Sequence, residues 1–176
     1  MKYLRLVFAL IIASLTAILT GCLAPKYVVP TPPGSNYAHL YSAGSWGVNS
    51  DIWIYPDDTF KVTDFSSLSR RIEETRSGYR HGAFHSVIDL VQSENAWKIT
   101  SASLMQDMKS AARLKGEAVG VMDSSHDYLD IRFGGRAMKA DFSEGYAEML
   151  PSAKLLDGFA LIVGRMVSLT RGTSRK

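Results

Sequence analysis

The chain contains a single cysteine, Cys22, and this limits how the fold can be stabilised. One cysteine cannot close an intramolecular disulfide or supply the two to four thiolates of a typical structural zinc site, so the fold must depend on its hydrophobic core. The composition suits such a core, because 46% of the residues are hydrophobic and 21% are charged, as in ordinary globular proteins. Residues 46–176 alone are about as long as a typical single domain. We therefore expect one globular domain without cross-links.

The N-terminal residues have the pattern of a secretory signal peptide. Basic Lys2 and Arg5 precede an apolar run, residues 6–19, and the small residues Gly21 and Cys22 close the pattern. A membrane-spanning helix needs about 20 apolar residues, whereas this run is shorter and is interrupted by polar side chains. The segment therefore indicates a cleaved signal peptide, residues 1–21, and not a membrane span.

The tetrapeptide Leu19-Thr20-Gly21-Cys22 resembles the lipobox of bacterial lipoproteins, and this resemblance covers residues 1–22 only. It implies cleavage between Gly21 and Cys22, a diacylglyceryl group on the Cys22 sulfur and usually a further acyl chain on its amine. One acyl chain binds a membrane only reversibly, whereas two or three hold a protein firmly. The next residue is Leu23 and not aspartate, which in Gram-negative lipoproteins implies sorting to the outer membrane. We therefore expect a protein anchored by its acyl chains to the periplasmic face of the outer membrane, without a cofactor.

The remaining chain divides by composition into a tether and a domain. Residues 22–40 are rich in proline and glycine, so we expect an extended tether that follows the acylated cysteine. Residues 41–176 are expected to form a single globular domain with a frayed, basic C-terminal tail. Signal cleavage removes Lys2 and Arg5 but no acidic residue, so the formal charge of +3 falls to +1. We therefore expect no nucleic-acid partner.

Runs of β-branched and aromatic residues, broken by turn-forming residues, indicate β-hairpins. The first turn, residues 56–59, combines a proline with two aspartates, and the second is Gly134-Gly135. A charged stretch after the first hairpin fits an exposed strand or a short helix, and we favour the strand. The expected strands are residues 51–55, 60–62, 69–76, 128–133 and 137–142.

Two segments carry apolar residues at helical spacing. The first is residues 82–95, and the second is a longer helix that we expect to open at Pro151, since proline suits a first helical turn. Residues 98–122 show no decisive pattern. The expected apolar stripe of the second helix is Leu155, Phe159, Ile162, Val163 and Met166. These elements predict an α+β fold, an antiparallel sheet built from β-hairpins with two main helices packed on one face.

His81, His85 and Asp89 are the strongest candidates for chemistry, because at helical spacing they lie along one flank of the first predicted helix. Imidazole and carboxylate groups in this arrangement could bind zinc. However, the glutamate of the H-E-x-x-H pattern is absent, and a plain polar flank explains the same residues. We therefore predict no metal site and keep these three residues as its weak candidates. The alternative function is a periplasmic hydrolase, either metal-dependent or metal-free. It would use His81, His85 or His126 together with Asp89 or Asp127.

Trp46, Trp53 and Tyr55 cluster around the first hairpin, and a segment of mixed charge, residues 70–80, follows it. Aromatic residues and arginine dominate many binding surfaces, so these three side chains are candidates for docking a partner protein. The alternative is that they pack in the core or beneath the tether.

We expect a non-enzymatic binding module with an inhibitor, immunity or envelope-assembly role. This function predicts dispersed histidines and an exposed apolar patch near residues 46–55. Hydrolysis would instead require the candidate histidines and aspartates to converge on one pocket. The two functions therefore differ in where the fold places these side chains.

Overall fold

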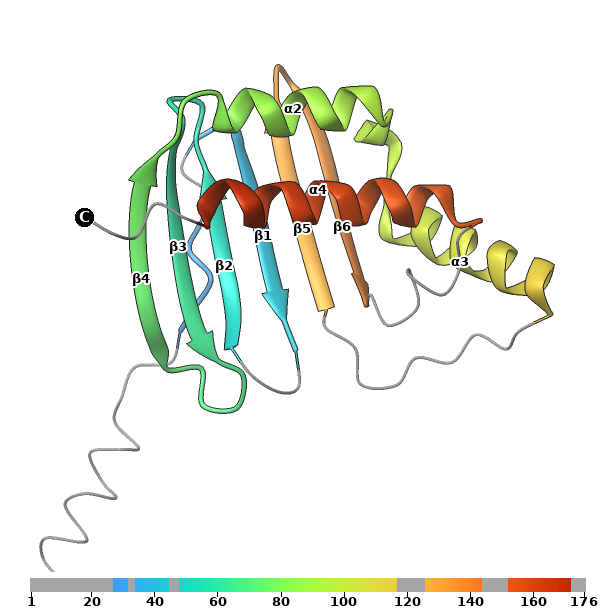
Figure 1. The fold of residues 1–176 in the computed structure, drawn as a ribbon, viewed down its shortest axis with the longest axis horizontal. Coiled ribbons are helices and arrows are strands. Elements are labelled where there is room, and N and C mark those ends of the chain that lie inside the picture. Colours follow the sequence, from blue (N-terminus) through green and yellow to red (C-terminus); the bar gives the residue numbers. More distant parts are fainter. Residues whose placement is uncertain (1–26, 32–33, 45–47, 117–125, 144–151, 172–176) are drawn as a thin grey trace, which may run out of the picture.

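The computed structural model describes residues 27–31, 34–44, 48–116, 126–143 and 152–171; the predicted signal peptide, Cys22, Trp46 and Pro151 lie outside them. A six-stranded antiparallel sheet with strand order β4-β3-β2-β1-β5-β6 forms the centre of the fold (Figure 1). The strands are β1 (Tyr37–Ala43), β2 (Val48–Ile54), β3 (Thr59–Ser66), β4 (Ile72–Tyr79), β5 (His126–Phe133) and β6 (Arg136–Ser143). The helices are α2 (Ala83–Ser93), the short 3₁₀ helix η1 (Ala96–Lys98), α3 (Ser101–Lys115) and α4 (Lys154–Thr170).

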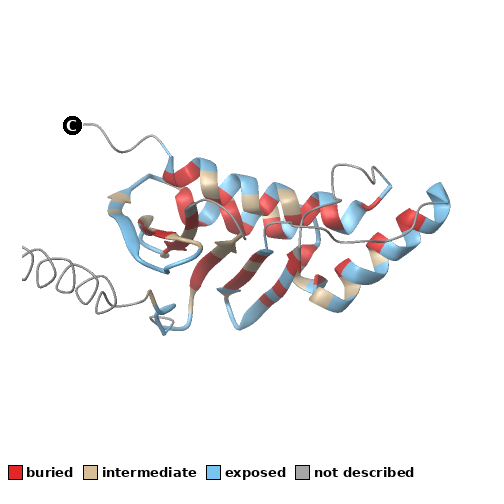
Figure 2. Cartoon of the chain, turned by 90° about the horizontal axis from the view of Figure 1, so that it is seen from below, coloured by how far each residue is buried: buried red, intermediate tan, exposed pale blue. Residues whose placement is uncertain are grey.

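The sheet and its helices confirm the predicted α+β class. α2 and α4 lie side by side across one face of the sheet, and α3 packs at the end of the sheet next to β6 (Figure 1). Figure 2 shows the buried residues concentrated between the sheet and this helix layer. The core contains Phe84 of α2, Phe159 of α4 and the strand residues Leu40, Ile52, Ile54, Leu129 and Ile131. Burial of this apolar surface is the main favourable contribution to folding.

Both predicted hairpins are confirmed. β2 and β3 join through a turn in which Asp57 accepts hydrogen bonds from the backbone N–H and the hydroxyl of Thr59, at 3.1 and 2.7 Å. β5 and β6 join through Gly134 and Gly135, whose φ values of 57° and 77° favour glycine. The charged stretch is strand β4, as favoured, although the strand begins at Ile72 and not at residue 69.

Both predicted helices are present, with a correction to the second. α2 buries the expected apolar residues of the 82–95 segment. α4 begins at Lys154, and it turns Leu156 into the core, whereas Leu155 is 36% exposed. The prediction for Leu155 is therefore wrong: the helix is rotated so that Leu156, and not Leu155, is the first leucine of its buried face.

α3 is a third helix, in the stretch where no decisive pattern was found. Its buried residues are few and partly small: Leu104, Met108, Ala111 and Ala112. The helix starts with a capping box, in which Thr100 and Ser103 each accept a hydrogen bond from the other's backbone N–H at 3.1 and 2.8 Å. It packs on β6 and α4, so tertiary contacts stabilise a helix whose apolar stripe is weak.

A carboxylate from the first hairpin caps α2. Asp58 accepts hydrogen bonds from the backbone N–H groups of Gly82 and Phe84 at 2.7 and 3.0 Å. Desolvation acts to raise the pKa of Asp58, but these two donors outweigh it and hold the pKa below its usual value. The hairpin turn therefore fixes where α2 starts, because it satisfies backbone donors that the helix leaves free.

α4 is held at both ends by side chains from other elements. At its N-terminus the Asp107 carboxylate of α3 accepts a hydrogen bond from Leu155 N at 3.0 Å. At its C-terminus Arg80 Nη1 donates to the carbonyl of Ser168 at 3.0 Å. A negative group at the start and a positive group at the end both complement the helix dipole. These contacts position α4 over the sheet beside α2.

The segment predicted to be a tether belongs to the domain from residue 27 onward, so the predicted boundary at residue 40 is corrected. β1 lies between β2 and β5 in the middle of the sheet, and its first residue, Tyr37, is fully buried. Upstream of it, Tyr27 stacks on Phe65 with ring centroids 4.8 Å apart. Tyr27 N also donates to the Arg70 carbonyl at 2.7 Å. Tyr27 thus packs on the face of the sheet opposite to α2 and α4.

A glycine in β4 leaves room for a core aromatic ring. A Cβ added at Gly78 would lie 2.5 Å from the Phe60 ring, whose side chain is buried. We expect Gly78→Ala to lower the free energy of unfolding by about 1–3 kcal/mol, as overpacking does. Gly158→Ala in α4 would meet only Glu94, at 3.7 Å, and should raise stability by up to about 1 kcal/mol because glycine is a poor helix former. Urea unfolding of both variants tests this, and effects of the same sign would contradict it.

Candidate functional site

Trp53, one of the predicted binding residues, lies in a buried polar network. Its side chain is 2% exposed and stacks on the His39 ring, with ring centroids 3.8 Å apart. Trp53 Nε1 donates to Asp51 at 3.1 Å, and His39 Nε2 lies 2.6 Å from the same carboxylate. The Tyr27 hydroxyl donates to Asp51 as well. We call these four residues the Asp51 network.

The predicted aromatic docking patch is therefore corrected. Trp53 cannot contact a partner, because the Asp51 network holds it between the sheet and the segment that begins at Tyr27. Tyr55 is half-buried, and Trp46 lies outside the described residues. His39 was missed by the sequence analysis because it falls in the stretch assigned to the tether, where no pattern marked a strand.

A second group of polar side chains lies beside the Asp51 network; its Tyr37 and Asp130 are buried, and its Arg132 is half-exposed. The Tyr37 hydroxyl donates to Asp130 at 3.2 Å, and Arg132 Nε donates to the same carboxylate at 3.1 Å. Burial and the Asp130 carboxylate raise the pKa of Tyr37 to about 12. Desolvation and the Asp51 carboxylate likewise raise the pKa of Tyr27. Both hydroxyls therefore stay protonated at neutral pH, as hydrogen-bond donors to buried carboxylates require.

The structure does not bring the weak metal candidates together. His81 precedes α2, its side chain is 93% exposed, and it lies 4.0 Å from Asp58. His85 and Asp89 are exposed on α2 itself. In the described part of the chain, no three His, Cys, Asp or Glu side chains are grouped closely enough to hold one metal ion.

His126 and Asp127 are also separated, because successive residues of a strand point to opposite faces of the sheet. His126 is half-exposed and lies 3.6 Å from Asp141 of β6. Asp127 is 2% exposed, and its Oδ1 has no hydrogen-bond partner among the residues that the structure describes. The two side chains thus do not form a proton-relay pair.

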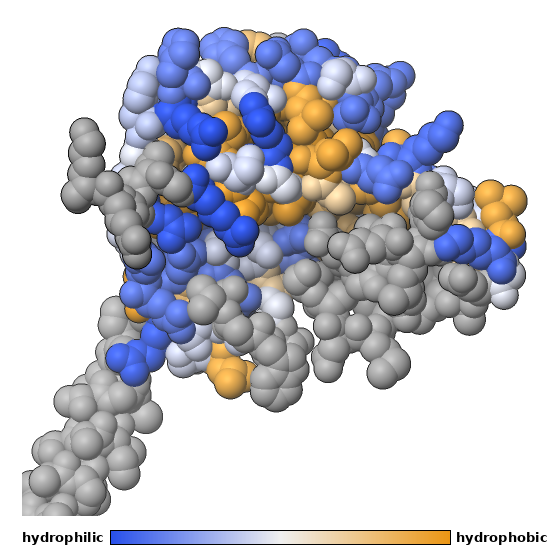
Figure 3. Space-filling view, viewed as in Figure 1, coloured by the Kyte–Doolittle hydropathy of each residue, from blue (hydrophilic) through white to orange (hydrophobic). Residues whose placement is uncertain are grey.

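A groove runs between α2 and α4 on the outer side of the helix layer, and its volume is about 970 Å³. Figure 3 shows hydrophobic surface between the two helices, bordered by hydrophilic side chains. Leu90 of α2 and Ala160, Leu161 and Gly164 of α4 supply its apolar and small residues. Leu161 is 54% exposed. We call this feature the α2–α4 groove.

The margins of the α2–α4 groove are polar. Arg165 Nε donates to Ser86 Oγ at 2.8 Å and so bridges the two helices. Asp89 and Asp157 add two carboxylates, and neither has an ion-pair partner among the described residues. Nothing lies within 4 Å of the position that a Cβ on Gly164 would take. The groove therefore offers an accessible helix backbone, an exposed leucine and a margin that carries two carboxylates and one arginine.

The sequence carried only a weak signal for the α2–α4 groove. Ala160 and Gly164 are small residues four positions apart, and Leu161 lies outside the predicted apolar stripe of α4. Small residues at this spacing recur where a second helix packs closely against the first. The signal could not identify a groove, because the second wall comes from α2, which is distant in the sequence.

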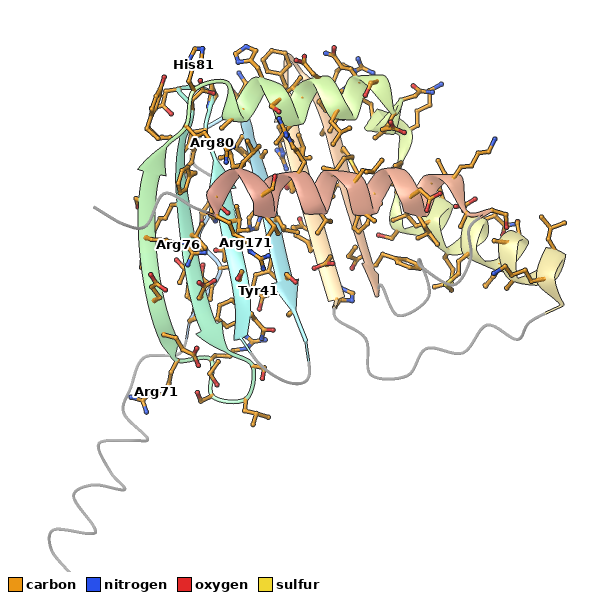
Figure 4. The ribbon with its side chains drawn as sticks, viewed as in Figure 1. Tyr41, Arg71, Arg76, Arg80, His81 and Arg171 are labelled. Carbon is orange, nitrogen blue, oxygen red and sulfur yellow. The ribbon has the colours of Figure 1, made fainter. Side chains whose placement is uncertain are left out.

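A second, polar cleft of about 600 Å³ lies under the C-terminal end of α4. Arg76 of β4 and Arg171 after α4 both line it, and Figure 4 shows the two arginines near each other. Arg76 is paired within the cleft, since its Nη1 lies 2.7 Å from Asp64 and 3.6 Å from Glu74. The carboxylates of the cleft thus already neutralise Arg76, so this arginine is not free to bind an anionic ligand. We therefore take the α2–α4 groove as the better candidate site.

Comparison with known proteins adds no assignment: no family model matches this chain, and no curated protein matches its sequence. Of the helices in the described ranges, none combines the length and the apolar composition needed to cross a bilayer.

Proposed function

We propose that this protein is a lipid-anchored envelope lipoprotein whose domain binds a helix of a partner protein in the α2–α4 groove. The groove is the observation that carries the proposal. It exposes apolar surface between two helices, and Leu161, which lines it, is 54% exposed. A helix that lays its apolar face into such a groove is a recurring mode of protein recognition.

The groove also suggests the chemistry of the partner. The small residues Ala160 and Gly164 let a third helix approach α4 closely. The carboxylates of Asp89 and Asp157 favour lysine or arginine on the flanks of that helix. The partner is therefore an amphipathic helix with basic residues beside its apolar face. An inhibitor, immunity or envelope-assembly role is compatible with such a contact.

The anchor and the location rest on the signal sequence. The lipobox-like residues 19–22 support acylation of Cys22, and Leu23 supports sorting to the outer membrane with the domain in the periplasm. Confinement at a membrane raises the effective concentration of the domain near a partner in the same membrane. A groove of modest affinity is then sufficient.

A hydrolase is the less favoured function. Its candidate groups His81, His85 and His126 do not line the α2–α4 groove or the polar cleft. A catalytic site needs its acid–base groups within reach of one bound substrate. The dispersal of these histidines supports a binding module, and we propose that the protein is not an enzyme.

Replacement of Leu161 tests the groove. We expect Leu161→Asp to weaken partner binding roughly 30-fold, which corresponds to loss of about 2 kcal/mol at a binding hot spot. A photoreactive amino acid at position 160 of the full-length protein, expressed in its own host, would capture the partner, and mass spectrometry would identify it. Affinity is then measured with the purified pair.

The matched control is Leu114→Asp on α3, because Leu114 is 82% exposed and does not line the groove. Leu114→Asp should leave both the cross-linked product and the affinity unchanged. Retention of the partner by Leu161→Asp, or an equal loss in both variants, would contradict binding in the α2–α4 groove.

A further inference from the structure

The distance between the anchor and the folded domain is short. Tyr27 is the first described residue, and it is bonded to the domain through Arg70 and Phe65. Only residues 23–26 separate it from Cys22. A fully extended chain advances at most about 3.3–3.6 Å per residue, so Tyr27 lies no more than roughly 18 Å from an acylated Cys22. The domain therefore cannot stand far from the lipid surface.

The part of the domain nearest to this attachment point is the loop between β3 and β4. Tyr27 N donates to the carbonyl of Arg70, which belongs to this loop, at 2.7 Å. Its ring stacks on Phe65, near the end of β3. The short connection to Cys22 thus starts beside the β3–β4 loop, at the end of the sheet from which Arg71 projects (Figure 4).

The β3–β4 loop, residues 67–71, has a fixed shape. Arg70 N donates to Ser66 O and Ser66 N donates to Arg71 O, each at 2.9 Å. Arg70 adopts a φ of 53°. These hydrogen bonds join the two ends of the loop, so its backbone holds the exposed side chains in fixed positions.

The exposed side chains of the loop suit a membrane surface. Leu68 is 82% exposed, and both Arg70 and Arg71 are exposed. The next acidic residues are Glu73 and Glu74 on β4, and Glu74 lies 3.6 Å from Arg76. The loop therefore combines one apolar side chain with two cations, the pattern by which peripheral segments enter the interface and meet acidic headgroups.

We propose that the β3–β4 loop docks on the lipid surface that holds the anchor, with Leu68 inserted among the lipid headgroups and Arg70 and Arg71 against the phosphates of acidic phospholipids. This inference rests on the proposed lipid anchor. Docking fixes the orientation of the domain. β4 runs from Ile72 at the loop to Tyr79, four residues before α2, and at about 3.3 Å per residue this places Tyr79 roughly 23 Å from Ile72.

A fluorescent probe at position 68 tests the docking. The acylated full-length mature protein carrying Leu68→Cys would be labelled with an environment-sensitive fluorophore and reconstituted into phosphatidylethanolamine–phosphatidylglycerol vesicles. The label is specific, because Cys22 is the only native cysteine and its sulfur is acylated. We expect blue-shifted emission and quenching by headgroup-labelled lipids. Leu114→Cys is the control, since Leu114 is equally exposed at 82% but lies on α3, so its probe should stay in water.

The arginines are tested in the same system. We expect Arg70→Asn with Arg71→Gln to reverse most of the blue shift and quenching at position 68, and asparagine tolerates the positive φ of Arg70. Unchanged quenching in this variant would overturn the role of the arginines.

Flotation and mass spectrometry separate failure of docking from failure of the anchor. An acylated protein that floats with the vesicles, but whose probe at position 68 behaves like the probe at 114, would overturn the docking. A chain without acyl groups that does not float would overturn the proposed lipid anchor itself.

Discussion

Cys22→Ser is expected to abolish the incorporation of labelled fatty acid into this protein. The change removes the thiol to which the diacylglyceryl group would be attached, and Cys22 is the only cysteine of the chain. Each buried CH₂ contributes about 0.8 kcal/mol to membrane attachment, so loss of two or three chains removes the anchor. Metabolic labelling, with the mass of the N-terminal peptide as a second readout, measures the effect.

The control for Cys22→Ser restores a thiol elsewhere in the chain. Cys22→Ser combined with Leu114→Cys carries an exposed cysteine on α3, and it should also remain unlabelled, because acylation depends on the residues before Cys22. Fatty acid on either variant would contradict the lipoprotein assignment. Cleavage of the signal should fail together with acylation, so both variants should keep the mass of the precursor.

Asp51→Ala is expected to destabilise the domain about as strongly as truncation of a buried aromatic side chain to alanine would. The carboxylate is 1% exposed and accepts from Trp53 and Tyr27, and His39 lies 2.6 Å from it. Its removal takes a hydrogen-bond partner from the buried Trp53 and His39 side chains and from the half-buried Tyr27 hydroxyl. Loss of one partner from a buried polar pair costs about 3–5 kcal/mol, which corresponds to a fall in Tm of about 10 °C for a domain of this size. Calorimetry measures the change.

Two further variants separate the Asp51 network from general effects of charge. Glu74→Gln removes a carboxylate that is 56% exposed and lies 3.6 Å from Arg76, and it should cost less than about 1 kcal/mol. Tyr27→Phe removes only one hydroxyl and should cost about 1 kcal/mol, while making the N-terminal segment more sensitive to proteolysis. A loss in Glu74→Gln as large as that in Asp51→Ala would refute the special role of the network.

The elements that were predicted correctly are those with a local cause. The turn at Asp57 and the Gly134-Gly135 pair form because their own backbone and side chains favour a reversal. α2 was predicted because its apolar residues recur every three or four positions, which places them on one face of a helix in any context. Such elements need no knowledge of the rest of the fold.

The elements that were missed depend on distant contacts. α3 has a weak apolar stripe and is stabilised by β6 and α4. β1 was assigned to a tether because its polar and aromatic residues, among them His39, gave no alternation that marks a half-buried strand. His39 and Leu40 of β1 are buried on opposite faces of the sheet, because Leu40 packs in the core and His39 stacks on Trp53.

In the candidate site, too, local features could be predicted from the sequence, whereas features that depend on distant contacts could not. Sequence reasoning found the aromatic residues of the first hairpin but could not tell which face of β2 would be covered. Trp53 is buried beside Asp51 and Tyr27, and Tyr27 lies in the predicted tether. The alternative that these aromatic residues pack in the core or beneath the tether is therefore the one that holds for Trp53. The α2–α4 groove needs one wall from each of two helices, and their relative position is set by the caps from Asp58, Asp107 and Arg80.

The hairpins and the two amphipathic helices, and with them the α+β class, could be predicted from the sequence, since each element follows from interactions between residues close together in the chain. The argument for the lipid anchor also rests entirely on the sequence, in residues 19–23. The packing of Tyr27 against the sheet, the burial of Trp53 in a polar network and the groove between α2 and α4 could be found only in the folded domain. These outcomes depend on which surfaces meet, and that choice is made by packing among elements far apart in the chain.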